Sequence, residues 1–92
     1  MKVWCVPVNF PNPEKEPEQA EAARRFLNTL KGLKGFTMGE NGILLLTFTE
    51  KGDARMAKWK LEEFCPARLE IIEGVMTDDG KRVDLHRVLK GE

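Results

Sequence analysis

The sequence contains no tyrosine, one histidine and only two cysteines. The cysteines, Cys5 and Cys65, are too few for a disulfide scaffold and fit free thiols in a reducing compartment. His86 has no companions at the spacing of metal ligands. The glycines Gly39 and Gly42 are not followed by the helix or the Lys-Ser/Thr pair of a phosphate-binding loop. We therefore expect no metal ion, no cofactor, no catalytic residue and no enzymatic activity.

Long apolar runs and a signal-peptide pattern are also absent. The run Ile43 to Leu46 is far too short to span a bilayer, so we expect no membrane association and a cytoplasmic protein. Fifteen basic and fifteen acidic residues give a net charge of zero. A neutral chain needs a local basic patch to bind nucleic acid, because phosphate neutralisation drives that binding. The overall charge therefore does not favour a nucleic-acid partner.

The first half of the chain shows a strand followed by an amphipathic helix. Residues 2–10 are rich in β-branched and aromatic side chains, which is typical of a strand. Three prolines follow, and they place Pro17 near the first turn of a helix. The apolar residues after it recur at helical spacing and predict one buried helix face: Ala20, Ala23, Phe26 or Leu27, Leu30 and Leu33.

The second half predicts two strands, a helix and a further strand. Asn41-Gly42 is a hairpin signal between two short strands, and a helix is expected from about residue 51 to residue 64, before Pro66. Residues 68–77 predict a strand, and Asp78 to Gly80 predict a turn. Residues 81–89 fit either a fifth edge strand or a short helix that covers the sheet. The order predicts an α+β fold, a single domain over residues 1–92 with the ferredoxin-like split βαβ arrangement, sheet order 4-1-3-2 and both helices on one face.

Part of the second half resembles an RNA-recognition-motif domain. The matching apolar and small residues are Gly42, Leu44, Leu46, Phe48, Asp53, Ala54 and Ala57. The resemblance implies a sheet whose aromatic side chains stack RNA bases. The corresponding positions here are Ile43, Leu45 and either Val6 or Pro7, which are aliphatic. The resemblance therefore supports the fold and does not support RNA binding by the sheet.

Strand alternation predicts an apolar contact surface on the sheet. If Leu44, Leu46 and Phe48 point towards the helices, Ile43 and Leu45 lie on the other face. Val3 and Pro7 of the first strand share that face. A strand that is apolar on both faces implies that both are covered. The cover is the chain's own tail, a second copy or another protein.

The helix expected over residues 51–64 carries a second candidate surface. Ala54, Ala57 and Leu61 cluster on its buried side, and Trp59 lies nearly opposite with Met56 beside it. Exposed tryptophan and methionine are typical of interface anchors. Alternatively, the tail or a loop covers Trp59.

These patterns predict a non-enzymatic protein-interaction module that forms a homodimer or docks onto a larger protein. In size and fold it resembles phage-type inhibitors such as anti-CRISPR proteins. A first alternative is a nucleic-acid-binding domain that uses the basic C-terminal residues Lys81, Arg82, Arg87 and Lys90. A second alternative is a small-molecule regulatory domain.

Overall fold

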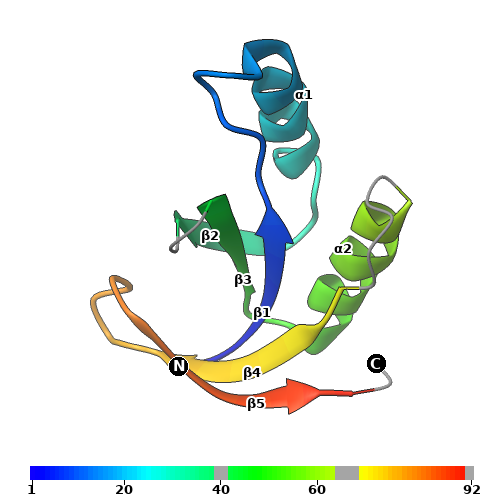
Figure 1. The fold of residues 1–92 in the computed structure, drawn as a ribbon. Coiled ribbons are helices and arrows are strands. Elements are labelled where there is room, and N and C mark those ends of the chain that lie inside the picture. The colour runs from blue at the N-terminus through cyan, green and yellow to red at the C-terminus, as the bar shows by residue number, and fades with distance from the viewer. Residues whose placement is uncertain (39–41, 64–68, 91–92) are drawn as a thin grey trace.

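The computed structural model describes residues 1–38, 42–63 and 69–90 of the chain (Figure 1). Gly39, Asn41, Cys65 and Pro66, which entered the predictions above, lie outside the described residues. The elements are β1 (Lys2–Asn9), α1 (Pro17–Leu27), β2 (Leu33–Met38), β3 (Ile43–Phe48), α2 (Lys51–Glu62), β4 (Ile71–Met76) and β5 (Val83–Leu89). Neither helix is long and apolar enough to cross a bilayer, among the residues described.

The strands form one antiparallel sheet in the order β2-β3-β1-β4-β5. The described residues therefore form an α+β domain with five strands and two helices. The tail is a strand that pairs with β4, so it is not a helix lying over the sheet. The turn before β5 explains why the tail forms a strand. Gly80 has φ +71°, and the carboxylate of Asp79 accepts a hydrogen bond from the Lys81 amide at 3.0 Å. These contacts reverse the chain and bring β5 alongside β4.

The main core lies between the sheet and the two helices. Val6, Val8, Leu44, Leu46 and Phe48 are buried there, as strand alternation predicts. Buried residues of both halves of the chain pack against them, namely Leu27, Leu30, Ala54, Ala57, Leu61 and Ile71. We call this side of the sheet the helix face and the other side the open face.

Helix α1 is shorter than its apolar spacing predicts. Leu33 was expected on the helix but belongs to β2, and α1 ends at Leu27. The hydroxyl of Thr29 donates to the carbonyl oxygen of Phe26 at 2.6 Å and terminates the last turn. Gly32, with φ +77°, then redirects the chain into β2. The helical spacing of Leu30 and Leu33 is thus coincidental.

The open face has a small core of its own. Val3, Cys5 and Met76 are buried, and Leu45 and Val83 pack against them. No helix covers this face among the described residues. In Figure 1, β4 and β5 cross the lower end of β1 steeply, and β1 pairs with β4 only from Lys2 to Cys5. The strong twist folds the β4–β5 hairpin towards β1, which buries residues that a flat sheet would leave exposed.

Candidate functional site

Three of the predicted contact residues meet on the open face. Pro7 lies directly opposite Leu45, and Ile43 lies opposite Asn9 at the end of the same strand pair. Opposite residues of an antiparallel pair share one face. Pro7, and not Val6, is therefore the first-strand position on this face. Leu45 and Pro7 are half-buried, and Ile43 is 40% exposed.

Val3 lies on the open face but contributes no accessible surface. It is fully buried with Cys5, so neither side chain touches a partner in this conformation. The thiol of Cys5 lies 3.7 Å from the hydroxyl of Thr47. Burial raises the pKa of the Cys5 thiol above its ordinary value, and the hydrogen bond with Thr47 opposes that rise only in part. Cys5 is accordingly a packing residue and a poor nucleophile.

Strand β5 extends the open face, which the sequence interpretation missed. Val83 is opposite Met76 and Val88 is opposite Ile72, so both valines share the face of Cys5. Leu85 is opposite Gly74 on the same face and is 47% exposed. The alternation of Val83, Asp84 and Leu85 after a turn signal was the available clue, but it fits a short helix equally well.

Met56 and Trp59 lie on the other side of the molecule. Helix α2 buries Ala54, Ala57 and Leu61 against the helix face of the sheet. Met56 and Trp59 project from the opposite side of that helix and are about half exposed, at 50% and 51%. No described residue covers Trp59 fully. The predicted contact residues therefore form two separate surfaces, and one flat interface does not reach both.

The buried charged pair of α2 has a structural role. Lys58 is 7% exposed, and its ammonium lies 3.4 Å from one carboxylate oxygen of Glu62. The other oxygen accepts a hydrogen bond from the backbone amide of Leu69 at 3.0 Å. The carboxylate thus ties the last turn of α2 to the chain that enters β4. The pairing with Glu62 accounts for the burial of Lys58, so no bound ligand is needed to explain it.

The four basic residues of the C-terminal segment do not form a compact patch. Lys81 and Arg82 precede β5, whereas Arg87 is near its end and Lys90 follows it. At about 3.3 Å per strand residue, the first and last lie roughly 30 Å apart along the strand. Arg82 is also paired with Asp84, at 3.2 Å between the guanidinium Nε and a carboxylate oxygen. The strand positions of the open face include no aromatic side chain in the described part of the chain.

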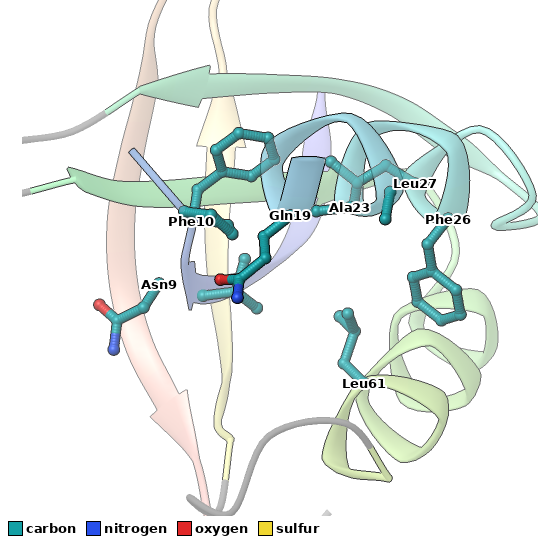
Figure 2. A pocket seen from close by; sticks show the side chains of 10 residues that line it. Asn9, Phe10, Gln19, Ala23, Phe26, Leu27 and Leu61 are labelled. Carbon is teal, nitrogen blue, oxygen red and sulfur yellow. The ribbon is translucent and has the colours of Figure 1, made fainter. Parts of the chain in front are cut away.

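An apolar cavity of about 420 Å³ lies between α1, the end of β1 and α2 (Figure 2). Its described lining consists of Val8, Asn9, Phe10, Pro11, Gln19, Ala22, Ala23, Phe26, Leu27 and Leu61. Of these, the sequence predicts Ala23, Phe26 or Leu27, and Leu61 as buried, and it gives no sign of a cavity. In retrospect, the small Ala22 and Ala23 on this side of α1 leave the space above Val8 unfilled.

Within residues 1–38, 42–63 and 69–90, no group of three or more histidine, cysteine or carboxylate side chains is arranged to hold a metal ion. Candidate binding sites among the described residues include the open face, the outer side of α2 and the cavity. No protein-family model, curated protein or solved structure matches the chain.

Proposed function

We propose that the chain is a non-enzymatic protein-interaction module that binds its partner through the open face of the sheet. The observation that supports it most is that the open face carries partly or largely exposed apolar side chains on β3, β1 and β5, namely Ile43, Leu45, Pro7, Leu85 and Val88. Leu45 and Pro7 are half-buried, whereas Ile43, Leu85 and Val88 are exposed. Interface cores have this composition, since they exclude charge and bury aliphatic side chains.

The partner is a second copy of the chain or a larger protein. Action as an inhibitor of the phage type belongs to the same proposal, because such proteins work by occupying a surface of their target. The cytoplasm is the proposed compartment, since the Cys5 thiol is unpaired. For the fold, we infer the ferredoxin-like split βαβ arrangement extended by one strand. Read from the β4 side, β4-β1-β3-β2 follows the order 4-1-3-2, and β5 is added beyond β4.

Substitution of an exposed open-face residue tests the interaction. Ile43→Asp places a charge on the open face, and Val75→Asp is its matched control. Val75 is a strand residue of similar exposure, 43% against 40%, but it shares the helix face of Glu73. Purified, tagged variants are used to capture partners from a lysate of the source organism, and captured proteins are quantified by mass spectrometry. We expect Ile43→Asp to lose partners that both the wild type and Val75→Asp retain. Equal capture by all three proteins would refute the open-face interface.

The cavity favours a second candidate function, the binding of a small apolar molecule. A volume of about 420 Å³ falls within the range of ligand sites. The carboxamide of Gln19 supplies a neutral hydrogen-bonding group in an otherwise largely apolar lining (Figure 2). Titration with N-phenyl-1-naphthylamine, a neutral fluorescent probe, tests this function. Ala23→Leu fills the cavity and is expected to abolish probe binding, whereas Ile43→Asp leaves binding intact. If the wild type does not enhance the probe's fluorescence, the cavity is not a ligand site.

A further inference from the structure

Strand β5 lies at the edge of the sheet, and no other described element covers it. Its five central residues, from Asp84 to Val88, are all exposed. Only one side of its backbone is paired, because β4 lies next to it and no other described strand lies beyond it in the sheet. An exposed edge of seven residues is a ready template for a further strand.

A bulge sets the directions of the β5 side chains. Arg87 is opposite Glu73 and Leu85 is opposite Gly74, so His86 is an extra residue without an opposite partner. In a regular strand, residues three apart lie on opposite faces. Because His86 is inserted between them, Asp84 and Arg87 both lie on the helix face, opposite Val75 and Glu73 respectively. By the same shift, Val83 and Val88 both lie on the open face.

This pattern is complementary to itself. When two copies of β5 are placed antiparallel about a two-fold axis perpendicular to the sheet, each residue keeps its face. With Asp84 opposite the second copy's Arg87, Val83 comes opposite the second copy's Val88, and every one of these pairs shares a face. Symmetry produces each pair twice. The two paired strands thus form two ion pairs on the helix face and two valine pairs on the open face.

Other registers lack this match. A shift by one residue in either direction places Arg87 opposite Leu85 or Val83, which lie on the other face. A shift by two residues places Asp84 opposite Leu89 in one direction and opposite Leu85 in the other, and either shift removes both ion pairs. The second edge of the sheet, β2, carries Lys34 as its only charged residue and offers no ion pair to a copy of itself.

We propose that the chain forms a symmetric dimer in which the β5 strands of two copies pair antiparallel, with Asp84 of each opposite Arg87 of the other. The sheet then continues through both copies, and their open faces lie on the same side. Asp84 keeps its contact with Arg82, since a carboxylate accepts several N–H groups. This inference goes beyond the proposed function, because the two copies meet at the β5 edge of the sheet and not through the open face.

Charge exchange tests the pairing and its register. In Asp84→Arg, both crossing pairs become Arg–Arg; in Arg87→Asp, both become Asp–Asp. Each variant alone is expected to weaken dimerisation about tenfold or more. When the two variants are mixed in equal amounts, both crossing pairs become Arg–Asp, so a heterodimer is expected to form with near wild-type affinity. Analytical ultracentrifugation from micromolar to millimolar concentration gives the dissociation constants.

Matched controls carry the same charge changes outside the strand. Asp78→Arg and Lys81→Asp lie in the exposed turn before β5, and we expect both to dimerise as the wild type does. A wild type that stays monomeric at millimolar concentration overturns the inference. So does a dimer that resists both single exchanges, or singles that fail to recover on mixing. A dimer broken by Ile43→Asp and unaffected at Asp84 overturns the β5 pairing while supporting the open-face interface, so the two proposals fail separately.

Discussion

The position of β5 depends on Gly74 having no side chain. A Cβ built on Gly74 lies 2.5 Å from the carbonyl oxygen of Asp84 and 3.3 Å from the Cα of Leu85. Both atoms belong to the backbone of β5, so they move away only if the strand itself moves by about an ångström. Overpacking of this kind costs roughly 1–3 kcal/mol. Alanine also restricts the unfolded chain, which offsets about 0.5–1 kcal/mol of that loss.

We therefore expect Gly74→Ala to lower the free energy of unfolding by about 1–2 kcal/mol. For a domain of this size, each kcal/mol corresponds to a fall in melting temperature of about 4–8 °C. Gly35→Ala in β2 is the control, because nothing lies within 4 Å of its added Cβ. Its stability should be unchanged or slightly higher. Urea unfolding followed by far-ultraviolet circular dichroism measures both variants. Equal stability of Gly74→Ala and Gly35→Ala would show that β5 does not pack on Gly74 as described.

Three further predictions concern α2, the β4–β5 turn and the bulge. Trp59→Ala should lower the free energy of unfolding by less than about 1.5 kcal/mol in urea titrations, because a buried tryptophan costs about 3–5 and this one is half exposed; a larger loss would mean that Trp59 is covered. Hydrogen bonds from the Thr77 hydroxyl and the Lys81 amide lower the pKa of the Asp79 carboxyl. The stabilisation from this group is present above its unfolded pKa and is lost as the pH falls through the lower folded pKa. Thr77→Val should raise the pKa of Asp79 towards its ordinary value in an NMR titration, and an unchanged value would exclude the hydroxyl as the cause. Deletion of His86 should tighten the dimer in ultracentrifugation by making β5 regular; weaker dimerisation would contradict the proposed register.

The faces of the strands were predictable from the sequence. Leu44, Leu46 and Phe48 alternate with more exposed residues, and a strand has no other way to bury such a set. The direction of Trp59 was also predictable, since the buried positions of α2 fix the direction of the opposite side; its exposure was not, because the tail or a loop could have covered it. These features depend on local geometry alone. Contacts made elsewhere in the chain therefore do not change them.

Features that depend on contacts between distant segments were not predictable. Leu33 continues the helical spacing of α1, yet a hydrogen bond by Thr29 and the turn at Gly32 end the helix earlier. Val3 was predicted as contact surface because alternation gives its face but not its depth. Its burial follows from the twist that folds the β4–β5 hairpin towards β1, and Met76 lies in the same small core. Periodicity carries no information about that twist.

The bulge in β5 is open to two opposite interpretations, and the side chains decide between them. Bulges and charged residues are common devices that protect an edge from pairing. A protected edge works best with charges of one sign, because any copy of the strand then meets repulsion. Strand β5 instead carries one charge of each sign, and Asp84 and Arg87 lie on the same face. A two-fold axis therefore places Asp84 of each copy opposite Arg87 of the other, and these opposite charges attract. The bulge thus limits pairing with unrelated strands, while the arrangement of charges leaves the edge complementary to a second copy of itself.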